Sequence, residues 1–494
     1  MSKLTLHSGA RTEQIFFEGS PLLAELLFAR ADSPEHLCGG RGVCKKCLVT
    51  VKTAEDAGPR QVLSCRTRLA GNAEVWLSAG PDWMIEGAEN AAARCSSAAG
   101  SGPCAANDGP VGAAIDIGST TLVVQIRNIT DGSVLSSAAM PNPQRKISAD
   151  IMGRIQAAME GKGTVLQKLV TGAVSALLAE ACELAGIPRD RLAAKVITGN
   201  TTMLTLLTGE DPSGLSRAPF LMSDAFGRTA ECAGLGTAYL PGCLHAFAGA
   251  DTACAILACG LPEGGETCLL CDIGTNGEIV LKKNGVLYVT STAAGPAFEG
   301  AGIACGSGSV TGAIDHVTVE NGALNVHTIG NVPAAGLCGS GLIDAVACGL
   351  ELGLISETGA CEGGKIPLSG SVALYPEDVR TLQLAKAAVQ AGIRTLLETT
   401  GTGTDEISAL YLAGGFGSRL NPVSAGAIGL IPPQLVDRVR TAGNAALTGA
   451  ALLLTDPSCR EKEQQIRALS RYVSLGGNPL FNDHYMESML FGEE

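Results

Sequence analysis

Residues 113–121 read AAIDIGSTT, and nearly the same pattern returns at residues 269–277 as LLCDIGTNG. Each copy is an apolar run that ends in Asp-Ile-Gly followed by Ser or Thr, and a second apolar run comes after it. This pattern predicts a buried strand, a tight glycine turn and a second strand. The two copies lie 156 residues apart, measured from Asp116 to Asp272, and that period is too long for a solenoid. We therefore predict two similar half-domains with a cleft between them.

The chain around this repeat divides into zones by composition. Short strand-like runs and one helix pattern fill the first 80 residues, and a stretch rich in Ala, Gly, Ser and Asn follows them. Beyond that stretch, apolar strands alternate with longer helix patterns such as 164–185 and 376–398, which predicts α/β layers. The predicted segments are a small domain at 1–80, a flexible linker at 81–110, a first lobe at 111–245, and a second lobe with a C-terminal tail at 246–494.

The bulk composition limits the possible functions. A chain of 494 residues is too long for one hydrophobic core. Its net charge of −13 disfavours nucleic-acid binding, which needs a basic surface. We see no run of 18 apolar residues and no secretory signal, so we predict no membrane span and expect a cytoplasmic protein. In that reducing compartment its 18 cysteines are metal ligands or core residues rather than disulfides.

Four cysteines in the first zone have the spacing of a metal cluster. Cys38, Cys44 and Cys47 follow C-x5-C-x2-C, and 17 residues separate Cys47 from Cys65. Plant-type [2Fe–2S] proteins use C-x4-C-x2-C and a later fourth cysteine, so this chain has one extra residue in the first gap. The loop between the first two cysteines is glycine-rich, which lets backbone amides approach cluster sulfides. We predict a [2Fe–2S] cluster held by these four cysteines.

A structural zinc site is the alternative for these cysteines. Such sites usually pair two C-x2-C knuckles, and only one is present in this zone. A second C-x2-C, Cys268 and Cys271, lies far along the chain inside an apolar run. We interpret that pair as core packing.

Three glycine-bearing turns are candidates for a nucleotide site. The first two follow the repeated strands, where backbone N–H and hydroxyl groups can bind phosphate oxygens and the strand-end carboxylate can hold Mg2+ through water. The third follows the apolar strand 409–413, where bare glycine backbone leaves room for a flat nucleoside. The predicted catalytic residues are Asp116 and Asp272. The predicted nucleotide-binding residues are Gly118, Ser119, Thr120, Thr121, Gly274, Thr275, Asn276, Gly277, Gly414, Gly415 and Phe416.

Each turn alone is a weak signal, because an Asp can simply cap its local backbone at an ordinary strand turn. The three turns in order along one chain are a much stronger one. The P-loop pattern G-x-x-x-x-G-K-[ST] is absent from the sequence.

Taken together, these motifs resemble the reductive activators of corrinoid proteins, and the resemblance covers most of the chain. It rests on the cysteine loop, on the two repeated turns and on the third glycine turn. Further stretches that carry it are Thr198–Met203, Gly295–Gly300 and Cys338–Asp344. The chain looks shorter than several relatives, with a brief linker where some carry a middle domain. Its C-terminal end lacks the cysteine cluster that some relatives have there.

The resemblance implies a β-grasp ferredoxin-like domain followed by an α/β ATPase of the actin, sugar-kinase and Hsp70 kind, with two RNase H-like lobes around ATP. It implies that the corrinoid protein of a methyltransferase system is returned from Co(II) to Co(I) as ATP is consumed. An upstream low-potential electron donor is then required, and a homodimer is possible. A basic collar beside the cluster would consist of Arg41, Lys45, Lys46, Arg66 and Arg68; an ordinary solvated face is the alternative.

Other activities remain open from the residues. One is activation of a different low-potential target, such as a dehydratase. A second is a phosphotransferase with a regulatory ferredoxin domain, and a third is an ATP-switched binding module without turnover.

Overall fold

A computed structural model of the chain describes residues 1–8, 11–28, 47–54, 56, 58–77, 109–415 and 419–492. Several predicted features lie outside these described residues: Cys38, Cys44, Phe416, the collar residues Arg41, Lys45 and Lys46, and the 81–110 linker except its last two residues.

The N-terminal residues form a mixed sheet with the strand order β2-β1-β5-β3-β4. Strand β1 pairs antiparallel with β2 and parallel with β5, and β3 pairs antiparallel with both β4 and β5. Apolar side chains such as Leu4, Val51 and Val75 alternate along these strands and pack against Leu23 and Leu27 of α1. This is the predicted β-grasp arrangement. The elements are β1 (Ser2–Ser8), β2 (Arg11–Phe17), α1 (Leu23–Leu27), β3 (Leu48–Thr53), β4 (Arg60–Leu63) and β5 (Ala73–Leu77).

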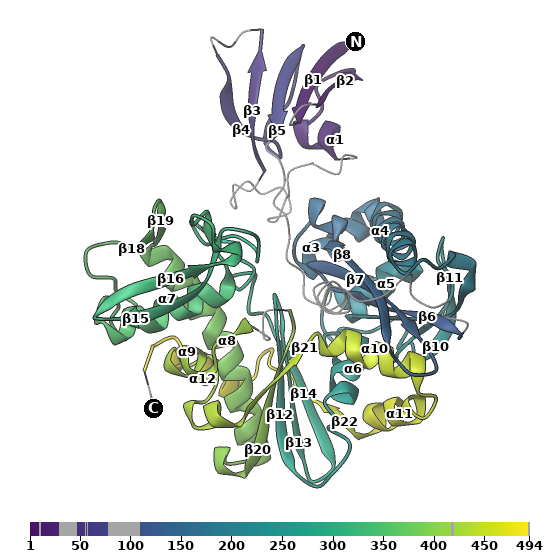
Figure 1. Ribbon diagram of the computed structural model, residues 1–494, viewed down its shortest axis with the longest axis vertical. Helices are drawn as coiled ribbons and strands as arrows, with labels where there is room; N and C mark the ends of the chain where they lie inside the picture. Colours follow the sequence, from purple (N-terminus) through teal and green to yellow (C-terminus); the bar gives the residue numbers. More distant parts are fainter. Residues whose placement is uncertain are drawn as a thin grey trace, which may run out of the picture.

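The first lobe is built on a sheet with the order β10-β11-β9-β6-β7-β8. Strands β6, β7 and β8 form an antiparallel meander, while β9 joins β6 in parallel. Helix α4 covers β7 and β8 on one face (Figure 1). The elements are β6 (Val111–Ile117), β7 (Thr121–Asn128), β8 (Val134–Pro141), α3 (Ile151–Ala157), α4 (Gly163–Leu184), β9 (Leu192–Gly199), α5 (Thr201–Thr208), β10 (Arg228–Cys232), β11 (Gly236–Leu240) and α6 (Ala250–Ala258).

The second lobe repeats this plan on a sheet with the order β21-β20-β12-β13-β14-β22. Strand β12 pairs antiparallel with β13 and parallel with β20, and α8 packs on β13 and β14. A hairpin of β15 and β16 packs on α7 beside this lobe (Figure 1). The elements are β12 (Thr267–Ile273), β13 (Gly277–Lys283), β14 (Val286–Thr292), β15 (Ala313–Glu320), β16 (Ala323–Thr328), β17 (Gly336–Leu337), α7 (Gly339–Glu351), β18 (Ile366–Ser369), β19 (Val372–Leu374), α8 (Pro376–Thr400), β20 (Ile407–Ala413), α9 (Pro422–Ala427), β21 (Val439–Gly443), α10 (Ala445–Thr455), α11 (Cys459–Leu469), β22 (Ser470–Tyr472) and α12 (Pro479–Glu487).

Helices α6 and α10 lie between the two sheets and pack against each other (Figure 1). Their apolar side chains share one core with residues of both sheets. Helix α11 then returns to the first lobe, where the buried Glu463 accepts hydrogen bonds from the Tyr239 hydroxyl and the Gly242 N–H, each at 2.8 Å. The predicted boundary between 245 and 246 falls in the loop between β11 and α6, and it stays a prediction.

Strand register brings the repeated turns together. The hairpins β6–β7 and β12–β13 end at the pairs Ile117↔Leu122 and Ile273↔Gly277. Because β20 runs parallel to β12, with Asp272 beside Ala413, the glycine turn after β20 lies next to the second hairpin turn. All three turns therefore leave the carboxyl ends of their strands at one cleft.

The helical segment 151–184 is long and apolar enough to cross a membrane by length and composition. Its apolar face nevertheless packs on the first sheet through side chains that include Leu166, Val170, Val174, Leu177 and Leu178. This is what a core helix of a globular lobe does, so the segment is weak support for a membrane span.

Candidate functional site

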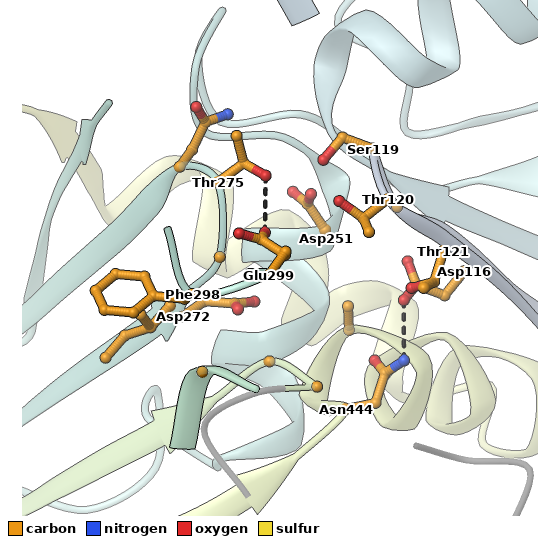
Figure 2. A pocket seen from close by; sticks show the side chains of 18 of the residues that line it. Asp116, Ser119, Thr120, Thr121, Asp251, Asp272, Thr275, Phe298, Glu299 and Asn444 are labelled. Atoms are coloured by element: carbon orange, nitrogen blue, oxygen red, sulfur yellow. Dashed lines mark hydrogen bonds between the residues drawn. The ribbon is translucent and has the colours of Figure 1, made fainter. Parts of the chain in front are cut away.

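The cleft between the lobes is lined by all three predicted turns (Figure 2). Of the predicted residues, the cleft brings together those of the two hairpin turns and the third glycine turn, except Gly277. The lining members are Asp116, Gly118, Ser119, Thr120, Thr121, Asp272, Gly274, Thr275, Asn276, Gly414 and Gly415. Gly277 instead begins β13, where a Cβ would lie 3.2 Å from Thr292 and 3.3 Å from Val389.

The first turn is so tight that it requires glycine at position 118. The Gly118 N–H donates to the Thr121 carbonyl at 2.9 Å, and a Cβ on Gly118 would lie only 2.8 Å from that same oxygen. The side chains of Ser119 and Thr120 point from this turn into the cleft (Figure 2). Hydroxyl and amide donors are thus gathered at one point, which suits phosphate oxygens.

Backbone and side-chain hydrogen bonds within its own lobe hold the second turn. The Gly274 N–H donates to the Asn276 carbonyl at 2.9 Å, and the Gly295 N–H donates to the Thr275 carbonyl at 2.8 Å. The Thr275 hydroxyl donates to Glu299 Oε1 at 2.7 Å. Burial raises the pKa of Glu299, and its Oε2 accepts no hydrogen bond among the described residues.

The third turn comes so close to Asp272 that only glycine fits. Gly414 has φ +90°, and a Cβ there would lie 2.6 Å from Asp272 Oδ1. The Gly414 N–H donates to the Gly443 carbonyl at 3.0 Å, which fixes the turn against β21. This contact links the predicted nucleoside element to the predicted catalytic carboxylate.

Asp116 is held from a distant part of the chain. The Asn444 side-chain amide donates to Asp116 Oδ2 at 2.9 Å, and Asn444 also caps α10 by accepting from the Leu447 N–H. The pKa of Asp116 is raised to about 7, chiefly by burial; the Asn444 hydrogen bond opposes this shift and the nearby charge of Asp251 adds to it. A carboxyl in that range can exchange a proton near neutral pH.

Two more carboxylates line the cleft. Burial raises the pKa of Asp251, in the first turn of α6, to about 6. Burial and the charges of Asp251 and Asp272 hold the pKa of Glu278 well above its usual range. A cation bound in the cleft would favour the charged forms of these carboxyls and lower their pKa values.

The carboxylates of the cleft would suit a Mg2+ ion that keeps most of its waters. Within the described residues, no three His, Cys, Asp or Glu side chains are close enough to share one metal ion. Mg2+ usually keeps several waters and takes one or two carboxylates together with substrate phosphates. Asp116 and Asp272 would serve as those carboxylates.

Several lining residues had no predicted role. Asn200, Phe298, Glu299 and Gly339 belong to stretches that carried the family resemblance, so a sequence signal existed for them. Asp251 and Asn444 carried no such signal, because neither stands in a repeated or glycine-bearing motif.

The described part of the predicted cluster site is a pair of adjacent thiols. Register pairs Leu48 with Leu63, and the Ser64 N–H donates to the Cys47 carbonyl at 2.9 Å. This brings Cys47 Sγ to 3.2 Å from Cys65 Sγ, although the two residues are 18 apart in sequence. The two thiols are in hydrogen-bond contact, somewhat closer than the about 3.7 Å expected for two thiolates on one tetrahedral metal with bonds of about 2.3 Å. The fold thus places two of the four predicted ligands side by side.

Other cysteine and basic residues can be placed in part. Cys268 and Cys271 are buried in β12, which confirms their interpretation as core residues. Of the predicted basic collar, the structure describes Arg66 and Arg68, and Arg68 donates to the Ser20 carbonyl at 2.7 Å.

Comparison with known proteins decides the family. Residues 111–264 match the model of the RACo middle region, and residues 266–494 match the C-terminal domain of RACo, the ASKHA domain. The chain is also 32% identical to the corrinoid activation enzyme RamQ of Eubacterium limosum over 77% of this chain and 70% of that protein. The chain belongs to the RACo family of reductive activators. The relatives whose names state an activity, a corrinoid activation enzyme and a corrinoid-protein reductase, are enzymes.

Two further matches agree with membership of the RACo family. A reductase of Methanosarcina barkeri that acts on a Co(II) methylated amine-specific corrinoid protein is 26% identical over 45% of each chain. A solved reductive activator for corrinoid, iron–sulfur protein has a TM-score of 0.71 and 23% identity, covering 99% of this chain and 98% of that one. This structural match confirms the predicted fold.

Proposed function

We propose that this RACo-family chain uses ATP to drive the one-electron reduction of a Co(II) corrinoid, bound in a partner protein, to Co(I). The observation that carries the proposal is that one chain of this family holds both a cleft with three phosphate-type turns and a close thiol pair. The electron comes from an external low-potential donor, and ATP is hydrolysed by water to ADP and phosphate.

The two hairpin turns bind the phosphates from opposite lobes. Amide and hydroxyl groups of residues 118–121 and 274–276 face the phosphate oxygens, and Gly414 and Gly415 leave room for the nucleoside. Asp116 and Asp272 position Mg2+ and the attacking water from either side. With a pKa of about 7, Asp116 is suited to accept a proton from that water.

Four cysteines would hold a [2Fe–2S] cluster: Cys38, Cys44, Cys47 and Cys65. When bound, such a cluster supplies one-electron transfer at a reduction potential of about −400 mV. The chain's own contribution is the β3–β4 register, which keeps Cys47 and Cys65 in place. An acceptor 100 mV more reducing leaves an uphill step of about 2.3 kcal/mol per electron. Closure of the lobes on ATP can offset this only through its different affinity for the two states.

The partners follow from this chemistry. They are the corrinoid protein of a methyltransferase system and a low-potential electron donor, with a homodimer as the proposed assembly. Because cluster thiolates must stay unoxidised, we place the reaction in the cytoplasm.

The test is an assay that mixes purified protein, a strong reductant, MgATP and a Co(II) corrinoid protein, and follows the Co(I) absorbance band. Co(I) is expected only with ATP present, and Cys65→Ser is expected to abolish its formation. Cys361→Ser, which changes a half-buried cysteine of the second lobe, is the matched control and should keep full activity. Equal Co(I) formation without ATP, or phosphorylation of a small molecule independent of the cysteines, would overturn the proposal.

A further inference from the structure

Arg154 of α3 is a fully buried arginine behind the first phosphate turn. Its guanidinium donates to neutral groups only: the Ser148 carbonyl at 2.9 Å, Gln144 Oε1 at 3.1 Å, and the carbonyls of Ser119 and Ala149. It also contacts Met203 Sδ at 3.2 Å. The nearby charge of Asp150 stabilises the guanidinium and that of Arg145 opposes it. With no carboxylate hydrogen-bonded to it among the described residues, the cost of its burial is offset mainly by the carbonyls that it holds.

A second buried side chain holds the same turn. Asn142 is 1% exposed; its side-chain amide donates to the Gly118 carbonyl at 2.8 Å, and its backbone N–H donates to the Thr120 carbonyl at 2.8 Å. Together with the bond from Arg154 to Ser119, three successive carbonyls of the turn are held from the side of the lobe.

Because peptide units are planar and trans, holding the carbonyls of the turn also fixes the direction of its N–H groups. In such a peptide the carbonyl of one residue and the N–H of the next point in opposite directions. Carbonyls of residues 118–120 held on the lobe side therefore direct the N–H groups of residues 119–121 the other way. Those three residues line the cleft.

We propose that Asn142 and Arg154 are positioning residues that orient the N–H groups of the first turn toward the nucleotide phosphates. The inference rests on the proposed binding of ATP in this cleft. The charge of Arg154 also fits the role, because it places positive potential one peptide unit behind a site for negative phosphates. Met203 contacts both side chains: its Sδ lies 3.7 Å from Asn142 Nδ2 and 3.2 Å from a guanidinium nitrogen of Arg154.

This assigns a use to part of the Thr198–Met203 stretch. Asn200 caps α5 by accepting from the Met203 N–H at 2.9 Å, which fixes the first turn of that helix. Met203 is thereby set against the two positioning residues.

The test compares nucleotide affinity in four variants by titration calorimetry with MgADP and MgATP. Arg154→Met is expected to weaken both dissociation constants about tenfold, or about 1.4 kcal/mol. Arg154→Lys keeps the charge but loses the planar fork, so a loss of about threefold is expected. Asn142→Asp keeps the acceptor but removes the amide donor to Gly118, and a loss of about tenfold is expected.

The fourth variant is the control. Arg127→Met removes an arginine of the same sheet that bonds Gln125 and the Gly132 carbonyl, about 20 Å along β7 from the turn. Its affinities should stay within twofold of the wild type. Thermal unfolding of each variant separates loss of stability from loss of affinity.

The possible results distinguish a failure of the positioning role from a failure of the proposed ATP binding. If Arg154→Met does not fold, Arg154→Lys and Asn142→Asp decide. Variants that lose stability but bind nucleotide within twofold of wild type would show that Arg154 and Asn142 only stabilise the fold. That result would overturn the inference. A wild-type protein that binds neither nucleotide would instead overturn the proposed function. In steady-state ATP hydrolysis, KM should rise more than kcat falls, because oriented amides act on the bound phosphates in both ground and transition states.

Discussion

The two hairpin turns of the cleft have almost the same sequence but quite different surroundings. In the first turn, the side chains of Asn142 and Arg154 hold two carbonyls and the Asn142 backbone N–H holds a third. Asn444, the cap of α10, donates to Asp116. The second turn is fixed by the pair Thr275–Glu299, and Gly414 lies against Asp272. A repeated motif thus supplies the same backbone geometry twice, while the neighbours give each copy its own electrostatics.

The difference is clearest at the two aspartates. Asp116 has an amide donor that favours its charged form and lies near the charge of Asp251. Asp272 instead lies against the third turn, where a Cβ on Gly414 would come within 2.6 Å of its Oδ1. We therefore expect the two carboxylates to make unequal contributions to hydrolysis, and substitutions at four positions of the cleft can break or sharpen that comparison.

The largest effect is expected for Asp272→Ala. If Asp272 positions Mg2+ and water as proposed, its loss should lower partner-stimulated ATP hydrolysis about 100-fold or more. The visible spectrum of the proposed N-terminal cluster should not change, because Asp272 lies outside the N-terminal sheet. Phosphate release and absorbance measure the two properties. Bleaching of the cluster in this variant would contradict the domain division.

Gly414→Ala should act on the same carboxylate through the backbone. The added Cβ would meet Asp272 Oδ1 at 2.6 Å in a residue with φ +90°, so hydrolysis should fall about tenfold. Gly132→Ala is the matched control, since Gly132 has φ +73° and nothing within 4 Å of its Cβ position. Both variants should lose about 1 kcal/mol of stability to backbone strain. Only the first should lose activity, as measured by phosphate release; equal activities would remove the role of this contact.

Asn444 separates helix capping from the support of Asp116. Asn444→Ala should cost about 1 kcal/mol of unfolding free energy through loss of the α10 cap, whereas Asn444→Ser keeps a capping oxygen. Both lose the hydrogen bond that lowers the pKa of Asp116, so the acid limb of the pH–rate profile should move to higher pH in both. Denaturant unfolding and the pH dependence of kcat/KM measure the two effects. An unmoved acid limb would show that Asp116 does not titrate in catalysis.

The smallest effect concerns the pH dependence of stability. The pKa of Asp251 is raised to about 6 by burial, so between about pH 4 and 6 the folded state binds more protons than the unfolded state. Its contribution to stability is therefore present at low pH and is lost as pH rises through that window. Asp251→Asn removes this contribution, on the order of 1 kcal/mol. Relative to wild type, the variant should gain stability from pH 4.5 to pH 7.5 in thermal unfolding without nucleotide. A constant difference would contradict the raised pKa.

The local elements were largely readable from the sequence. The helix patterns at 164–185 and 376–398 match α4 (Gly163–Leu184) and α8 (Pro376–Thr400). Strand β4 (Arg60–Leu63) was not predicted, since four residues with little apolar alternation carry no clear period. The two Asp-Ile-Gly turns were found because strand, carboxylate and glycine are contiguous and appear twice.

The sequence by itself determined the repeated hairpins, their strand-end carboxylates and the cysteine spacing, because each of these depends on residues that are neighbours in the chain. The tertiary structure alone decided which side chains act on them. Asn444 meets Asp116 across 328 residues. Glu299 and Asp251 line the cleft from separate elements, and Arg154 lies behind the first turn, where it donates to the Ser119 carbonyl. Such contacts depend on how two sheets pack around α6 and α10, and packing between distant segments leaves no local period in the sequence that could be read in advance.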